Sequence, residues 1–289
     1  MALKFGFDDL DSLGLRSPAL IAAFSGWNDA AEAASDVLNH LSETYKDTST
    51  ICQIDGEDFY DYQVNRPKVV RGPEGAATIW PETTFQLVRT PFRDLILLGG
   101  PEPNFRWKTF LKQVMEKIES LHPSQAVILG AMLTDSPHSR PLPVRVYSDD
   151  AVLRDRLRCE EPTYEGPTGI PGILRSSLQA AGIPTVSMWV SVPHYVATSP
   201  NPKATLALIR KISDALDICL DEAELPKKAV QWERNVEIAA GSDPDIREYV
   251  DRLEDLKDTE DLKENTGDEI ADELERFLRH RDQNGHGGD

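Results

Sequence analysis

Residues 95–129, LILLGGPEPNFRWKTFLKQVMEKIESLHPSQAVIL, decide the fold class of this chain. The stretch begins and ends with short apolar runs, at residues 95–98 and 126–129. Each run has the length of a strand and is apolar at every position, as a strand buried on both faces of an α/β sheet must be. Residues 105–121, which lie between the runs, place apolar side chains on one stripe at helical spacing, with Asn104 as the predicted N-cap.

The same alternation continues in both directions along the first 220 residues. Further apolar runs predict strands at residues 19–24, 51–54, 77–80, 85–88 and 185–192. Helical patterns occupy residues 28–45, 149–158, 171–181 and 202–220. Strands that alternate with helices predict a three-layer α/β domain with a mostly parallel sheet.

Composition and charge exclude several classes of protein. Hydrophobic residues make up 40% of the 289 residues and charged residues 28%, which is ordinary for a globular chain. The 49 acidic residues outnumber the 31 basic ones, for a formal net charge of -18, so neither nucleic acid nor an anionic membrane surface is an expected partner. The longest apolar and glycine run, residues 126–133, is far shorter than the roughly 20 residues that span a bilayer.

The cysteines and the N-terminus point to a cytoplasmic protein. Cys52, Cys159 and Cys219 are far apart and form no CxxC pair, which argues against a disulfide framework and against a zinc site. The N-terminus carries early acids and lacks the apolar core of a secretory signal. Because no HExxH or similar spacing occurs either, we expect no metal and no cofactor.

The last part of the chain differs in kind from the first. Residues 221–289 contain 22 acids and 10 bases, a net charge of -12, which leaves -6 for residues 1–220. The sequence therefore predicts an α/β core domain at residues 1–220, an acidic helical extension at 221–281 and a disordered tail at 282–289. The predicted helices of the extension are residues 225–240, 244–257 and 268–281. Their apolar stripes are thin, so they dock either on the α/β body or on a neighbouring subunit.

Loops that follow parallel strands line the usual binding crevice of α/β proteins, so the candidate site residues are expected there. The first loop holds Gly26, Trp27, Asn28 and Asp29 before a helix, where free N–H groups suit an anion. Asp29 would already satisfy those groups, so the capping role is favoured over phosphate binding. Trp27 is interpreted either as a pocket lid or as packed surface.

Two further loops carry polar or glycine residues. Gly99 and Gly100, with Glu102 beside them, form either a ligand cradle or a tight turn, and the turn is favoured because no nucleotide motif is present. Asp135, His138 and Arg140 invite a nucleophile–base interpretation, but the surrounding prolines favour an extended loop whose polar groups satisfy local backbone.

The last two candidate loops hold an imidazole and a stiff, glycine-rich segment. His194 and Tyr195 supply either a general base and a phenol or a packed pair at a strand end, and the packed pair is favoured. Glu165, Gly166 and Thr168 lie in the loop that leads into the helix at 171–181. No residue is assigned a catalytic role.

These loops resemble the proteasome assembly chaperone 2 family in its actinobacterial form. The matching segments are residues 22–30 (AAFSGWNDA), 59–62 (FYDY) with 66–67 (RP), 97–103 (LLGGPEP), 129–138, 164–170 (YEGPTGI) and 192–195 (VPHY). The resemblance implies a fold like that of the purine nucleoside phosphorylase and peptidyl hydrolase group, a cytoplasmic location and self-association as trimers. Trp27 and Asp29 depart from the arginines and small glycine loops that hold phosphate in such phosphorylases, which argues against phosphorolysis.

The function expected from these observations is protein binding without catalysis. The resemblance implies a homo-oligomeric factor that acts on a protein client, as eukaryotic relatives do in the assembly of the proteasome α-ring. The alternative is a hydrolase or glycosyl transferase that uses the crevice for a small-molecule substrate.

Overall fold

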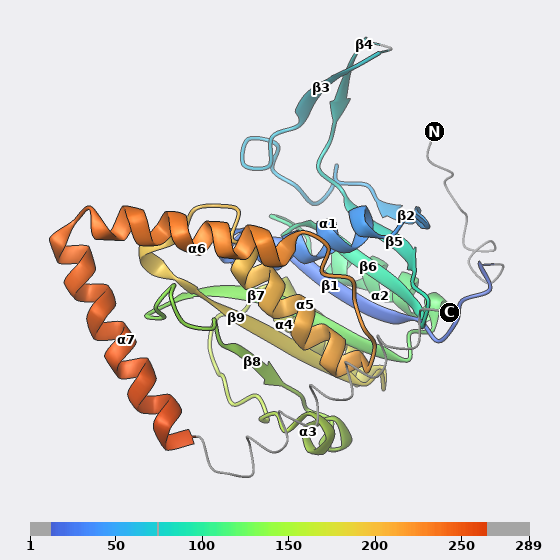
Figure 1. Cartoon of the computed structure of the whole chain (residues 1–289). Coiled ribbons are helices and arrows are strands. Elements are labelled where there is room, and N and C mark those ends of the chain that lie inside the picture. Colours follow the sequence, from blue (N-terminus) through green and yellow to red (C-terminus); the bar gives the residue numbers. More distant parts are fainter. Residues whose placement is uncertain (1–12, 74, 265–289) are drawn as a thin grey trace, which may run out of the picture.

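A computed structural model describes residues 13–73 and 75–264 of the chain (Figure 1). Its centre is a seven-stranded sheet in the order β2-β5-β6-β1-β7-β9-β8. The strands are β1 (Ala19–Ser25), β2 (Thr48–Ile54), β5 (Thr83–Arg89), β6 (Asp94–Pro101), β7 (Gln125–Thr134), β8 (Val144–Tyr147) and β9 (Thr185–Pro193). The central strands β6, β1, β7 and β9 are parallel neighbours, whereas β5 and β8 run in the opposite direction. The prediction of a mostly parallel sheet is therefore confirmed.

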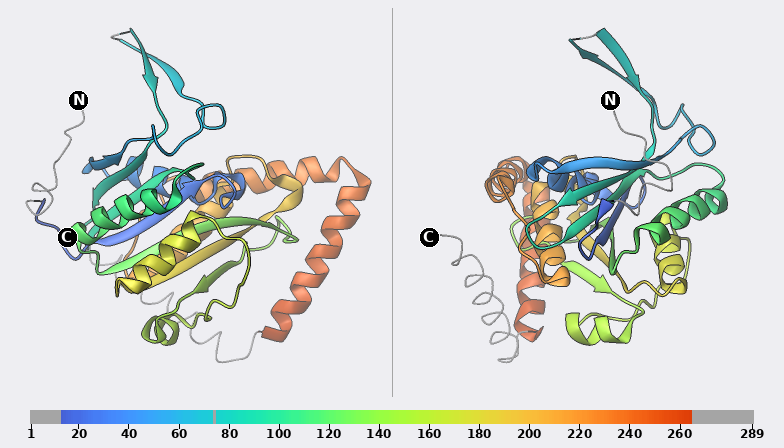
Figure 2. Two further views of the ribbon diagram at one scale, coloured as in Figure 1. Left: turned by 180° about the vertical axis from the view of Figure 1, so that it is seen from behind. Right: turned by 90° about the vertical axis from the view of Figure 1, so that its right-hand side faces the viewer.

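Helices cover both faces of the sheet and make three layers (Figure 2). On β1, Leu20, Ala22 and Phe24 pack toward one helix layer, whereas the residues between them pack toward the other. The first layer consists of α2 (Trp107–Leu121) and α4 (Ile170–Ala180), and the second of α1 (Ser35–Thr44) and α5 (Pro202–Leu216). Because both sides of the strands are buried, the runs are apolar at consecutive positions rather than at alternate ones.

Helix boundaries differ from the predictions where local backbone geometry intervenes. The helix predicted from residue 105 begins at Trp107, and Asn104 does not cap it. Asn104 instead accepts hydrogen bonds from the backbone N–H of Asp61 and from the side chain of Asn65. The helix predicted at 202–220 ends at Leu216, because the next residue adopts a left-handed conformation with φ of 52°.

The helix predicted at residues 28–45 is divided in two. A short 3-10 turn, η2 (Ala30–Glu32), precedes α1, which begins only at Ser35. Ala31 and Glu32 have positive φ values of 54° and 57°, so the chain cannot continue as one α-helix through this segment.

Two strands lie outside the central sheet. β3 (Lys68–Gly72) and β4 (Gly75–Ile79) form a hairpin that projects away from the body (Figure 1). All of their residues are exposed. The strand predicted at residues 77–80 therefore exists in part as β4, but its assignment to the buried sheet was wrong. β3 and β8 were not predicted.

The acidic helices pack on their own chain. α6 (Leu225–Gly241) lies against α5, and α7 (Pro244–Glu264) follows after a sharp corner. Buried side chains line their inner faces: Leu225, Ala229, Val236, Ala240, Val250 and Leu253. The predicted helix at 268–281 and the predicted tail at 282–289 lie outside the described residues. Within the described part of the chain, no helix is long and apolar enough to cross a membrane.

The short helix predicted at 149–158 is α3 (Ala151–Leu157). The Asp150 carboxylate caps it, since Oδ1 accepts hydrogen bonds from the backbone N–H groups of Val152 and Leu153 at 2.8 and 3.1 Å. This is the side-chain capping that helix N-termini favour.

Candidate functional site

The carboxyl ends of β1, β6, β7 and β9 meet at one edge of the sheet, and the predicted site residues lie there. They do not form one crevice. They form two groups, one around Glu102 and the other around His138. The two groups meet where Asp29 and Ala131 form an isolated β-bridge. There the Ala131 N–H donates to the Asn28 carbonyl at 2.9 Å.

Glu102 joins three of the predicted loops. Its Oε1 accepts hydrogen bonds from the Asn28 side chain at 3.0 Å and from the Ile170 backbone N–H at 2.8 Å. Ile170 is the first residue of α4, so the carboxylate lies where a helix N-terminus stabilises negative charge. Gly169 fits between these groups only because it has no side chain, since a Cβ there would lie 2.0 Å from the Asn28 Nδ2 atom. The loop at 164–170 is thus fastened to the loop at 26–29.

The Asp29 carboxylate accepts hydrogen bonds at the start of α1, although the N-cap residue of α1 is Ala34 and not Asp29. Its Oδ1 accepts from the Ala34 N–H at 2.7 Å, and its Oδ2 accepts from the Ser35 hydroxyl. Burial raises the pKa of Asp29, and the hydrogen bonds from Ser35 and Ala34 oppose that shift. Trp27, two residues earlier, is 73% exposed, so it is neither a closed lid nor packed surface.

The tight turn predicted at Gly99 and Gly100 was wrong, because both residues belong to β6. Each glycine is required by a close neighbour. A Cβ at Gly99 would lie 2.6 Å from Cδ1 of Leu38, and one at Gly100 would lie 2.6 Å from the carbonyl oxygen of Glu82. The two glycines therefore let α1 and the neighbouring backbone approach the end of β6.

His138 is completely buried in the second group. Its backbone N–H donates to the Tyr195 hydroxyl at 2.8 Å, and its Nδ1 lies 2.9 Å from the same oxygen. Its Nε2 lies 3.2 Å from Oε2 of Glu237, a residue of α6. A neutral imidazole satisfies this arrangement if the Tyr195 O–H donates to Nδ1 and Nε2–H donates to the carboxylate. Burial lowers the pKa of His138, and the charge of Glu237 acts in the opposite direction.

His194 lies beside His138 in a more open position. Its Nδ1 is 3.3 Å from Oδ1 of Asp135, and the Tyr249 hydroxyl donates to that same oxygen at 3.1 Å. The His194 and Tyr249 rings meet edge to face, with centroids 5.4 Å apart. Tyr249 belongs to α7, so the second group of site residues is partly covered by the acidic helices.

Arg140 is a further contact of this group to α7. It pairs with Asp258 at 2.8 Å and with Glu254 at 3.6 Å. The loop at 134–140 was predicted to satisfy its polar groups locally, but these partners lie more than 100 residues further along the chain. Sequence reasoning missed Glu237, Tyr249 and Glu254 because acidic helices with thin apolar stripes are typical of solvated surface.

The remaining predicted residues lie in the loop before α4. Gly166 has a φ of 154°, and the Tyr164 hydroxyl donates to the Pro167 carbonyl at 2.9 Å. A Cβ at Gly172 would lie 2.1 Å from the Thr168 hydroxyl oxygen, so Thr168 packs on the first turn of α4. Glu165 is exposed and contributes to neither group.

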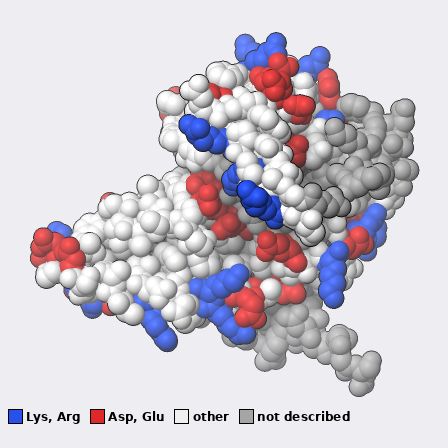
Figure 3. Space-filling view, turned by 90° about the horizontal axis from the view of Figure 1, so that it is seen from above, with Lys and Arg blue, Asp and Glu red and all other residues white. Residues whose placement is uncertain are grey.

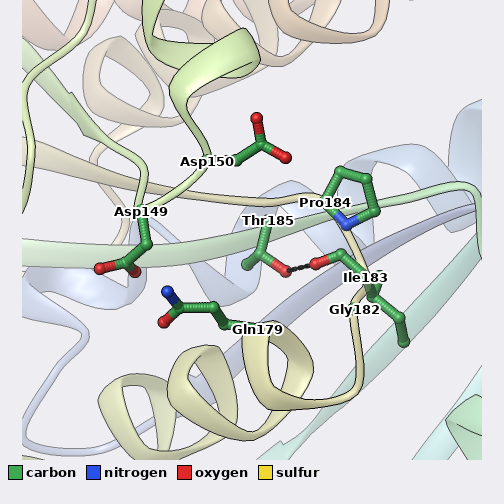
Figure 4. Close-up of a pocket in the computed structure, with 7 residues that line it drawn as sticks. All are labelled: Asp149, Asp150, Gln179, Gly182, Ile183, Pro184 and Thr185. Atoms are coloured by element: carbon green, nitrogen blue, oxygen red, sulfur yellow. Dashed lines mark hydrogen bonds between the residues drawn. The ribbon is translucent and has the colours of Figure 1, made fainter.

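A pocket of about 140 Å³ lies at the opposite edge of the sheet, near the start of β9 (Figure 4). The residues that line it are Asp149, Asp150, Gln179, Gly182, Ile183, Pro184 and Thr185. Its two carboxylates are already engaged, since Asp150 caps α3 and Asp149 pairs with Arg175. Among residues 13–73 and 75–264, no three His, Cys, Asp or Glu side chains are placed to hold a metal ion.

Apolar side chains project from the same edge as the predicted site. We call Trp27, Phe105, Met132 and Tyr164 the rim residues, because they lie on the segments that end or follow β1, β6 and β7 or precede α4, and all four are exposed. Exposed aromatic and methionine side chains are enriched at protein contacts. The rim residues can therefore form an apolar contact surface, supported by loops that hydrogen bonds hold together.

Fold and site together define a class: a three-layer α/β protein whose strand ends carry an apolar rim and are partly covered by C-terminal helices. The sequence profile of the PAC2 family matches residues 23–240, and the chain belongs to this family. No curated protein matches the chain in sequence.

Solved structures agree with this assignment. A PAC2 family protein from Streptomyces avermitilis is 42% identical, with a TM-score of 0.75, over 81% of this chain and 99% of that one. A proteasome-assembly chaperone homologue from Mycobacterium tuberculosis is also 42% identical, with a TM-score of 0.72, over 80% and 99%. PbaB from Pyrococcus furiosus, an archaeal proteasome activator, is 14% identical with a TM-score of 0.60 over 78% and 94%, which shows a shared fold alone.

Proposed function

We propose that this protein is a cytoplasmic, homotrimeric binding factor whose client is a proteasome subunit, and that it performs no catalysis. The observation that carries the proposal is the exposed apolar rim on a member of the PAC2 family. A similar protein from Mycobacterium tuberculosis is described as a proteasome-assembly chaperone homologue, which supports the choice of client.

The polar residues beneath the rim support a binding role through what they already contact. Glu102 joins the loop after β1 to the N-terminus of α4, and Asp29 accepts a hydrogen bond from the backbone just before α1. His138 has partners at both ring nitrogens. Such contacts hold the loops rigid, and a preorganised surface loses less conformational entropy when it binds a partner.

The test is a binding measurement with purified proteasome α subunits from an actinobacterium. The wild-type protein is expected to bind, and Trp27→Ala is expected to raise the Kd by about 30-fold, because a central aromatic anchor is worth about 2 kcal/mol or more. Val152→Ala is the matched control. Val152 is 76% exposed on α3, beside the opposite edge of the sheet, so its removal leaves the Kd unchanged. Equal Kd values for the wild type and Trp27→Ala would contradict the proposal.

The enzyme hypothesis makes an opposing prediction at His194. If this imidazole were a general acid or base, His194→Ala would lower turnover of some small substrate by about two to four orders of magnitude. We expect no turnover that depends on His194. A substrate screen that found such an activity, with the variant still folded, would replace the binding proposal with the hydrolase or transferase alternative.

A further inference from the structure

The β3–β4 hairpin has the features expected of an element that contacts another molecule. In the described part of the chain, β3 and β4 pair with each other and belong to no larger sheet. Figures 1 and 2 show the hairpin standing clear of the body in every view. An isolated two-stranded hairpin is at best marginally stable in water, and among the described residues β3 and β4 are exposed throughout, with only Trp80 beside them packed on Tyr62, which suggests that the hairpin packs on another molecule.

The hairpin carries both apolar and basic side chains. We call residues 64–80 the arm. Its exposed apolar side chains are Val64, Val69, Val70, Ile79 and Trp80. Its basic side chains are Arg66, Lys68 and Arg71, against one acid, Glu74, in a chain of net charge -18. The arm is therefore a basic, apolar projection on an acidic protein.

A surface of the opposite character lies where α6 meets α7. We call Ile238, Asp243, Asp245, Ile246 and Glu248 the corner surface. All five are exposed, and Ile238 is 68% exposed. In Figure 3 the α6–α7 corner is at the left, where acidic side chains gather beside a broad area without charged side chains. The five residues thus combine apolar contact area with three carboxylates, and the cation between them, Arg247, is already paired with Glu237 and Asp251.

The two surfaces are complementary but separate within one chain. The arm projects at the top of Figure 1, whereas the corner lies at the far left. α6 cannot swing toward the arm without leaving its contacts, because Val236 is buried, Glu237 meets His138, and Glu233 pairs with Lys203. An arm and a corner that meet must therefore belong to different copies.

We infer that the arm of one copy docks on the corner surface of the next copy. The inference rests on the self-association in the proposed function, and it assigns the surfaces that produce it. Two different patches in contact make a heterologous interface, which closes into a ring when the rotation between copies is suitable. Opposite charges orient the two surfaces, and the apolar side chains of both become buried.

The first test reverses the charge of the arm. The variant Arg66→Glu, Lys68→Glu, Arg71→Glu is expected to run as a 32.2 kDa monomer in light scattering at micromolar concentration, whereas the wild type runs as an oligomer. The matched control is Lys46→Glu, Lys108→Glu, Arg145→Glu, which makes the same change in net charge at three exposed positions on the body. The control is expected to keep the mass of the wild type.

The second test uses the corner surface and a mixing experiment. Asp245→Lys, Glu248→Lys is expected to be monomeric, whereas the control Glu43→Lys, Glu119→Lys keeps the wild-type mass. Each variant retains one intact partner surface. An equimolar mixture of the arm variant and the corner variant is therefore expected to associate, through the wild-type arm of one and the wild-type corner of the other.

The outcomes separate this inference from the proposed function. A monomeric wild type would overturn both the proposed self-association and the assignment of its surfaces. An oligomeric wild type whose mass is unchanged in the arm or corner variant would overturn the arm–corner contact alone. Monomeric variants that fail to combine on mixing would likewise overturn it, because the two surfaces would not then recognise each other.

Discussion

β4 and β5 are neighbours in sequence and opposites in environment. Only residues 80–82 separate them, and the apolar runs at 77–80 and 85–88 look alike. β5 lies within the sheet and contributes Phe85, Leu87 and Val88 to the core, whereas every residue of β4 is exposed. Strand formation is thus a local property that the sequence reveals, and burial is a property of the whole fold.

The largest expected effect compares a buried aspartate with an exposed one, each of which lies 2.6 Å from an arginine nitrogen. Asp94, at the start of β6, is completely buried and meets Arg16 at 2.6 Å and Arg89 at 3.0 Å. Asp58, near the base of the arm, also meets an arginine at 2.6 Å, but both partners are exposed. Asp94→Ala is expected to lower the free energy of unfolding by about 1–3 kcal/mol, because it leaves the Arg16 backbone N–H and two partly exposed guanidinium groups without their acceptor.

The matched change at Asp58 measures how much less an exposed ion pair contributes to the free energy of unfolding. Asp58→Ala is expected to cost less than about 1 kcal/mol, since water replaces the lost partner. Urea denaturation of both variants gives the two free energies directly. Similar losses for both variants would mean that exposure does not reduce the contribution of an ion pair in this protein.

Two valines test the same comparison between a buried and an exposed position, with no contribution from charge. Val88 on β5 is fully buried, and Val69 on β3 is 69% exposed. Val88→Ala removes two buried methyl groups and is expected to lower the free energy of unfolding by about 2 kcal/mol. Val69→Ala is expected to change it by less than about 0.5 kcal/mol. A loss at Val69 as large as that at Val88 in the monomeric protein would show that the arm packs on its own body.

The pH dependence of stability tests the burial of His138. His138 has a pKa lowered by burial, so the unfolded chain binds more protons than the folded one below about pH 6.5. The free energy of unfolding therefore falls as the pH is lowered from about 6.5 to the folded pKa, with a slope of at most about 1.4 kcal/mol per pH unit from this group.

Removing the imidazole should remove that part of the slope. His138→Gln is expected to lose stability less steeply than the wild type between pH 7 and 5 in chemical denaturation at each pH. Parallel curves for the wild type and His138→Gln would show that His138 gains protons equally in the folded and unfolded chain.

Local patterns predicted much of the carboxyl-edge site but not its division. Asp29 was expected to satisfy free N–H groups at a helix start, and its carboxylate accepts from the Ala34 N–H just before α1, although Ala34 is the N-cap residue. The contacts of His138 with Glu237 and of Asp135 with Tyr249 were not predicted. The two contacts join residues that are separated by 99 and by 114 positions in the sequence, and no local pattern in one segment identifies its partner in the other.

Errors in helix boundaries have the same origin. Asn104 stands where an N-cap is expected, yet it binds the segment around Asp61 instead, and α2 begins after Arg106 in a left-handed conformation with φ of 54°. Gly99 and Gly100 were interpreted as a turn because glycine permits one, whereas in the fold they permit close approach by Leu38 and by backbone. In each case a tertiary contact outweighed a local preference of about 1 kcal/mol.

The sequence by itself determined the α/β class, the positions of the central strands, the two helix layers and the family resemblance, because apolar periodicity and short motifs are written within a few consecutive residues. Only the tertiary structure decided that β4 lies outside the central sheet, that α6 and α7 pack on their own chain, and that most of the site residues form two groups. These outcomes depend on which distant surfaces bury one another, and the free energy of that burial belongs to the pair of surfaces rather than to either segment alone.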